Sequence, residues 1–110
     1  HVGSGTCGLY IHATPAAISN VSVIGQGPDI TKYGIYVSYS NVCTWNIGTQ
    51  NCECSILAAN ASTVYANGLF STGCHTSYAA PGGMVLRTGD VGSPVYQVEA
   101  TAAGGQIFAS

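Results

Sequence analysis

Five cysteines are the side chains of this 110-residue sequence with the clearest chemical potential. They could form two disulfides with one thiol left over, or some of them could bind a metal ion. Cys52 and Cys54 are separated by a single residue, which resembles half of a thiolate site. A zinc site needs two such pairs, or added histidines at set spacing. The sequence therefore favours disulfides, which stabilise a small domain by about 2–4 kcal/mol each.

The spacing of the cysteines suggests how they would pair. Segment 41–54 is typical of a hairpin with a turn centred near Gly48. Such a turn would bring Cys43 opposite Cys52 or Cys54, at a separation that a disulfide can close. The expected second bridge joins Cys7 and Cys74, which leaves Cys52 or Cys54 as the free thiol.

The three histidines raise the question of a copper site. At the start of the sequence, His1 offers an α-amine and an imidazole, and His12 or His75 could add a further imidazole. This arrangement resembles the histidine brace of lytic polysaccharide monooxygenases. The alternative is that processing or cloning happened to leave His1 at the terminus, and this alternative predicts no metal and no cofactor.

The four carboxylates do not form a recognisable catalytic pair. Asp29 and Asp90 lie in turn sequences, Glu53 lies between two cysteines, and Glu99 is expected to face water from a strand. The chain also lacks the Gly-x-Ser-x-Gly motif of a nucleophilic serine. Its residue types resemble those of fungal guanyl-specific ribonucleases, but their order differs. We therefore expect a protein without catalytic activity.

Seven tyrosines are more than a core of this size needs. Tyr36 lies on the polar side of its predicted strand, and Tyr39 follows it closely. Exposed tyrosines on a rigid sheet make contact surfaces that stack on sugars or proteins. The alternative is that they only stabilise the sheet through cross-strand pairs. Tyr36 and Tyr39 are the candidate surface-binding residues.

Charge and termini indicate where the protein acts. With two Lys or Arg residues and a net charge of −2, the chain cannot neutralise a run of phosphates, so nucleic acids and anionic membranes are not expected partners. The absence of an initiator Met suggests a processed, secreted protein. The sequons at Asn20 and Asn60 are candidate glycosylation sites and agree with an extracellular location.

Alternation of apolar and polar residues predicts strands along most of the chain. In 33–40, Tyr33, Ile35 and Val37 share one face, and the same parity continues to place Trp45 in the core. Further strands are expected in six short segments bounded by Gly, Pro, Asn or Asp: 21–24, 63–66, 76–79, 84–88, 95–101 and 106–109.

These elements predict an all-β fold, either an antiparallel β-sandwich or a small β-barrel stapled by disulfides. Residues 1–110 are expected to form a single domain without internal repeats, with at most one short helix over 54–60. Because one Lys does little to protect exposed strand edges, a homodimer formed through such an edge or through an apolar patch is a further hypothesis.

The whole pattern resembles small secreted fungal effector and elicitor proteins, including those that induce the hypersensitive response in plants. The resemblance lies in the cysteine arrangement, the scarcity of charge and the strand at 33–40. It implies a secreted protein that acts on a host receptor or a cell-wall polysaccharide without catalysis. Two alternatives are a carbohydrate-binding module that uses exposed tyrosines and a copper-binding protein that uses His1.

Overall fold

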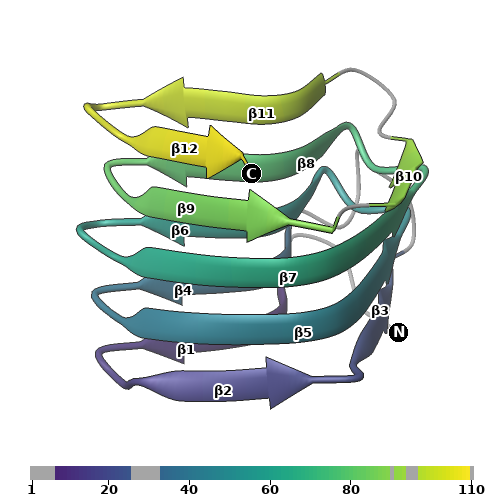
Figure 1. Cartoon of the computed structure of the whole chain (residues 1–110), viewed down its shortest axis with the longest axis horizontal. Helices are drawn as coiled ribbons and strands as arrows, with labels where there is room; N and C mark the ends of the chain where they lie inside the picture. Colours follow the sequence, from purple (N-terminus) through teal and green to yellow (C-terminus); the bar gives the residue numbers. More distant parts are fainter. Residues whose placement is uncertain (1–6, 26–32, 90, 94–96, 110) are drawn as a thin grey trace.

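The structure, a computed structural model, describes residues 7–25, 33–89, 91–93 and 97–109, and these residues form strands and turns without a helix. Two sheets lie one behind the other (Figure 1). Sheet A contains, in spatial order, β1 (Cys7–His12), β4 (Tyr33–Ser38), β6 (Cys54–Ala59), β8 (Thr76–Pro81) and β11 (Gln97–Ala102). Sheet B contains β12 (Gln106–Ala109), β9 (Met84–Thr88), β7 (Thr63–Thr72), β5 (Asn41–Gln50) and β2 (Ala16–Ser19), with β3 (Ser22–Ile24) beside β5 and β10 (Val91–Ser93) beside β7.

The chain winds as a β-solenoid in which each coil adds one strand to each sheet. In sheet A, Tyr33 pairs with Cys54, and Cys54 pairs in turn with Thr76. In sheet B, Asn41 pairs with Thr63, so these coils are 21 or 22 residues long in both sheets. All pairings between the described strands are parallel. The all-β prediction is confirmed, but the predictions of an antiparallel sandwich or barrel and of no internal repeat are wrong.

Columns of left-handed residues bend the coil at its corners. One column consists of four residues whose φ angles lie between 53° and 81°: Asn20, Asn46, Gly68 and Gly89. Glycine adopts this conformation without steric cost, and asparagine tolerates it better than most residues do. The Asn46 amide also donates a hydrogen bond to the Asn20 side-chain oxygen at 3.4 Å. This column bends β5 and β7, and their far halves pair with β3 and β10.

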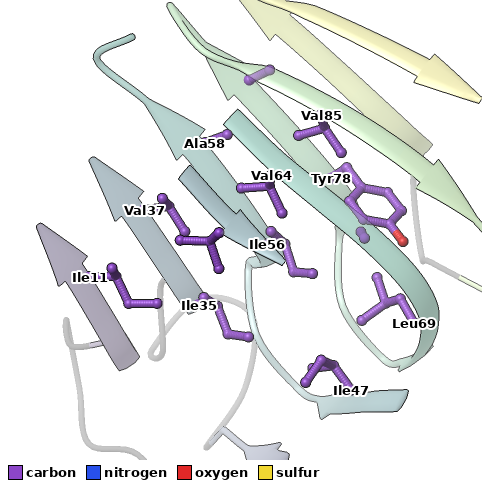
Figure 2. Packing of buried hydrophobic residues seen from close by; sticks show 13 residues of the cluster. Ile11, Ile35, Val37, Ile47, Ile56, Ala58, Val64, Leu69, Tyr78 and Val85 are labelled. Atoms are coloured by element: carbon purple, nitrogen blue, oxygen red, sulfur yellow. The ribbon is translucent and has the colours of Figure 1, made fainter. Parts of the chain in front are cut away.

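The core fills the space between the two sheets. Buried apolar residues from successive coils lie above one another, and Figure 2 shows Ile35, Ile56 and Tyr78 among them. These three residues occupy the same register position in β4, β6 and β8 and are fully buried. Stacking of equivalent positions is how a solenoid builds one continuous core from units that could not bury their apolar faces alone.

Two local predictions are corrected by this architecture. Segment 54–60 does not hold a helix, because its residues up to Ala59 form β6, and all six residues of that strand are buried. Parallel strands covered on both faces read as continuous apolar runs, which are hard to distinguish from a short helix. Trp45 is not in the core but 42 % exposed on the outer face of sheet B.

A partly exposed ion pair lies at the last coil. Glu99 has the register position of the buried Tyr78, and Arg87 that of the buried Ala66. Arg87 Nε donates to Glu99 Oε2 at 2.8 Å, and the guanidinium lies 5.7 Å from the centre of the Tyr78 ring. Glu99 therefore pairs with a cation, and 36 % of its side-chain surface remains exposed to water, the side to which the alternation in the sequence had assigned it. No helix long and apolar enough to cross a membrane occurs in the part of the chain that the structure describes.

Candidate functional site

A groove lined by apolar and aromatic side chains runs across the outer face of sheet B. Register pairing places Cys43, Tyr65, Leu86 and Phe108 in one row, each on a different coil. We call these four residues the apolar row. Tyr65 is 51 % exposed, and Leu86 and Phe108 are exposed as well. The row runs along the solenoid axis, perpendicular to the strands, with about 4.8 Å between neighbouring coils.

A second row lies beside the apolar row, two residues further along each strand. It contains Trp45, Asn67 and Thr88, which pair with one another across β5, β7 and β9. The two rows line one groove of about 300 Å³. This volume is at the lower end of the range for small-molecule sites. The groove therefore combines ring faces on one side with an amide and a hydroxyl on the other.

The groove is nearly free of charge. Among the described residues that line it, Arg87 alone is charged, and its guanidinium is engaged by Glu99 at 2.8 Å. An anionic ligand would therefore find no unpaired cation among the described residues that line this groove. A neutral ligand loses no ionic hydration when it enters such a site.

The predicted tyrosine surface lies on the other sheet. Tyr36 is half-buried on the outer face of sheet A, between the rings of Tyr10 and Tyr33, at centroid distances of 5.1 and 5.2 Å. Tyr39 is exposed in the turn that follows β4, where its ring contacts that of His12. Tyr36 and Tyr39 thus belong to an aromatic cluster that is separate from the groove.

The predicted disulfides are absent: the four cysteines whose side chains the structure describes are free thiols. Segment 41–54 is not a hairpin but a single pass along β5 and around a corner into β6. Cys43 and Cys52 therefore lie at opposite ends of β5 and do not face each other. Cys7 begins β1, and its side chain lies outside the described part of the chain. Cys74 precedes β8, three strands away in sheet A, or roughly 14 Å, which is too far for a disulfide.

Cys52 and Cys74 lie in the same corner of successive coils. The Cys52 backbone N–H lies 3.4 Å from Cys74 Sγ, and both side chains are fully buried. A hydrogen bond from the Cys52 thiol lowers the pKa of Cys74 to about 5 and raises the pKa of Cys52. Burial, aided by the nearby Cys74, raises the pKa of Cys54 to about 12.

A buried chain of hydroxyl groups accompanies these thiols. Thr49 Oγ1 donates to Ser55 Oγ at 2.7 Å, and Ser55 Oγ lies 2.9 Å from Ser71 Oγ. All three side chains are buried between the sheets. The buried hydroxyls satisfy one another, and no buried side-chain nitrogen or oxygen of the described residues lacks a partner. Because solvent does not reach them, these groups serve the fold and are not placed to attack a substrate.

The structure does not bring the predicted histidines together. His1 lies outside the described residues. His12 ends β1 and His75 precedes β8, so they lie at opposite ends of sheet A and three strands apart. The described residues contain no group of three His, Cys, Asp or Glu side chains that could hold a metal ion.

The other predicted sites are dispersed over the molecule. Asp29 and Asp90 lie outside the described residues, and Glu53 lies in the corner between β5 and β6. Asn20 and Asn60 are exposed corner residues with positive φ, and Asn60 Nδ2 donates to Ser38 Oγ at 3.1 Å. Glycosylation at Asn20 and Asn60 stays a prediction.

The groove residues were missed in the sequence because they are unlike one another and lie far apart. Cys43, Tyr65, Leu86 and Phe108 recur along the chain at the near-constant spacing of one coil. This period is the signal that could have revealed them. We find no match for the chain among models of protein families, curated proteins or solved structures.

Proposed function

We propose that this β-solenoid is a non-catalytic binding protein whose ligand is a neutral polysaccharide lying along the groove of sheet B. The observation that carries the proposal is the apolar row, in which Tyr65, Leu86 and Phe108 present exposed side chains from three successive coils. Sugar rings have apolar C–H faces that stack on aromatic rings. A row that repeats at each coil suits a polymer with a repeating unit better than it suits a single small molecule.

The neighbouring row supplies the polar contacts that a sugar requires. Asn67 offers both a donor and an acceptor, and Thr88 offers a hydroxyl, while Trp45 adds a further large ring with an N–H donor. Hydroxyl groups of a polysaccharide would meet these side chains at the edge of the stacked rings. Such a combination of rigid ring faces and a few polar groups is typical of ligand sites.

Charge supports a neutral polymer over an anionic one. The chain has only two Lys or Arg residues, and the one beside the groove, Arg87, is paired with Glu99. A polyanion binds largely through release of counterions to protein cations, which this face does not supply. Secretion, and recognition by a host receptor as an effector or elicitor, stay predictions of the sequence resemblance.

The single tryptophan of the chain gives a direct test, because Trp45 lies in the groove. Titration with cellohexaose, chitohexaose and laminarihexaose should change Trp45 fluorescence for at least one of them. Retention of the protein on the matching insoluble polysaccharide should follow the same preference. No retention on cellulose, chitin or β-glucan, together with unchanged fluorescence, would overturn the proposal.

A matched pair of variants assigns the binding to the groove. Tyr65 and Phe70 lie on the same strand and are both 51 % exposed, but only Tyr65 lines the groove. Tyr65→Ala should weaken binding by about fivefold, because loss of one aromatic stack is worth on the order of 1 kcal/mol. Phe70→Ala should leave the affinity unchanged. Equal losses in the two variants would show that the groove is not the site.

A further inference from the structure

The outer face of sheet A carries the second aromatic cluster of the molecule. It contains Tyr10 and His12 from β1, Tyr33 and Tyr36 from β4, and Tyr39 from the turn after β4. We call these five residues the tyrosine face. Tyr10 and Tyr36 are register partners on neighbouring strands, and their rings meet edge to face at 87°. The tyrosine face points away from sheet B and therefore away from the groove.

The rings of the tyrosine face hold one another in place. The His12 ring lies 5.9 Å from Tyr10 and 5.6 Å from Tyr39, and the Tyr39 contact is edge to face. Tyr10 Oη also lies 3.3 Å from His12 Nδ1, within hydrogen-bond distance. Side chains that are already fixed lose little conformational entropy when they bind a ligand. The face is thus organised before any ligand arrives.

The exposed groups of the tyrosine face fit a neutral, hydroxyl-rich ligand. Tyr10 and Tyr39 are 58 % and 60 % exposed, so each presents both a ring and a phenolic hydroxyl. In the tautomer in which Nδ1 of His12 accepts the bond from Tyr10, Nε2 carries a proton that can be donated to a hydroxyl. The described strands β1, β4, β6 and β8 contain no Asp, Glu, Lys or Arg.

We infer that the tyrosine face is a second saccharide site, so that one copy of the protein bridges two polysaccharide chains. This inference rests on the proposed function of the groove and adds to it. The two sites lie on the outer faces of different sheets, so one polymer chain along the solenoid axis in the groove does not cover the tyrosine face. The electrostatic argument is the same for both: each surface is uncharged and aromatic, and each has a few hydrogen-bonding groups at the ring edges.

The experiment counts binding sites by isothermal titration calorimetry with the hexasaccharide that changes Trp45 fluorescence. The wild-type protein should bind two molecules per chain. Tyr10→Ala/Tyr39→Ala should bind one and keep the Trp45 fluorescence change. Trp45→Ala/Tyr65→Ala should also bind one, and Phe70→Ala should still bind two. Each of these variants replaces exposed side chains only, and circular dichroism checks that each retains its β-structure.

A second measurement uses the wild-type protein alone, in case a variant fails to fold. NMR signals of the His12 imidazole should shift on titration with the same hexasaccharide, and a soluble polymer of that sugar should be cross-linked into turbid aggregates. One site per chain, with unshifted His12 signals, would overturn the second site and leave the groove intact. Concentration-dependent dimerisation abolished by Tyr10→Ala/Tyr39→Ala would instead assign the face to a second copy. If no sugar binds at all, the proposed function itself fails.

Discussion

The Cys54 thiol couples the stability of the protein to alkaline pH. Its side chain is buried against the outer side of sheet A, near Tyr33 and Tyr36. Burial raises its pKa from 9.0 to about 12, because the thiolate is poorly solvated there. The unfolded chain thus releases this proton at lower pH than the folded chain does. The contribution to stability is complete below pH 9 and is lost as the pH rises toward 12.

We predict that Cys54→Ala flattens this alkaline loss of stability. Above the unfolded pKa, one such group changes the free energy of unfolding by about 1.4 kcal/mol per pH unit. Urea unfolding from about pH 8 to about pH 11 should therefore give a shallower decline for the variant. The two proteins share every other ionisable group, so the difference in slope isolates Cys54. Parallel declines in the two proteins would contradict the assignment.

The buried hydroxyl chain makes a second prediction for a single residue. Ser55→Ala removes the partner of both Thr49 and Ser71, whose hydroxyls have no access to water. We expect a loss of about 1–3 kcal/mol in the free energy of unfolding, the usual cost of leaving buried polar groups unpaired. Ser19→Ala, at an exposed position of β2, should change it by less than about 0.5 kcal/mol. A similar change in the free energy of unfolding for the two variants would rule out a structural role for the buried hydroxyl groups.

Single elements show what alternation along the sequence determines. Segments 33–40, 84–88 and 106–109 were predicted as strands from alternation and flanking turn residues, and β4, β9 and β12 confirm them. Alternation indicates which face of a strand is buried, but it does not indicate whether the neighbouring strand is parallel. Gly48 was therefore interpreted as the centre of a hairpin turn, although β5 continues through it and only bends at Asn46, which has a positive φ. Hairpins and solenoid corners use the same residue types, so the direction of the chain could not be predicted from them.

Close contact between successive coils gives a prediction at the scale of one turn. An added Cβ on Gly83, between β8 and β9, would clash with the backbone oxygen of Ala58 in the preceding coil. Gly83→Ala must therefore push two coils apart. We expect thermal unfolding to show a loss of about 1–3 kcal/mol or more in the free energy of unfolding. Gly48→Ala is the control, because its nearest contact would be the movable Ser22 hydroxyl at 3.4 Å. Equal stability of the two variants would contradict this packing.

The groove illustrates what only the whole molecule determines. Tyr65 and Phe108 are far apart in the sequence and yet belong to one row, because two coils bring them to the same face. Tyrosines were interpreted from the sequence as contact residues, but the proximity of Tyr65 to Phe108 follows from the coil length. The first coil hides that length, since Leu9 and Ile35 are register partners although the chain between them is longer than in the later coils. Unequal spacing and dissimilar residues at equivalent positions kept the repeat from being recognised.

A solenoid predicts tolerance of deletions that keep the coils in phase. Removal of residues 54–75 takes out one coil and places Thr76 where Cys54 had been, directly above Tyr33. Because each coil contacts mainly its neighbours, the remaining coils should restack and unfold cooperatively. The urea m-value should fall by about one fifth, in proportion to the buried surface lost. Circular dichroism should retain its β signature.

Deletion of residues 54–64 is the matched control, since it removes half a coil and less of the core. It would continue the chain from the corner after β5 directly into β7 near the start of that strand, so residues that form sheet B would take the place of a sheet A strand. Inward and outward side chains would then no longer align with those of the coils above and below, and we expect no cooperative transition. In a structure built by stacking, keeping the coils in register matters more than keeping a larger number of residues. If the half-coil deletion were the more stable of the two, stacking between neighbouring coils would therefore not be what holds this molecule together.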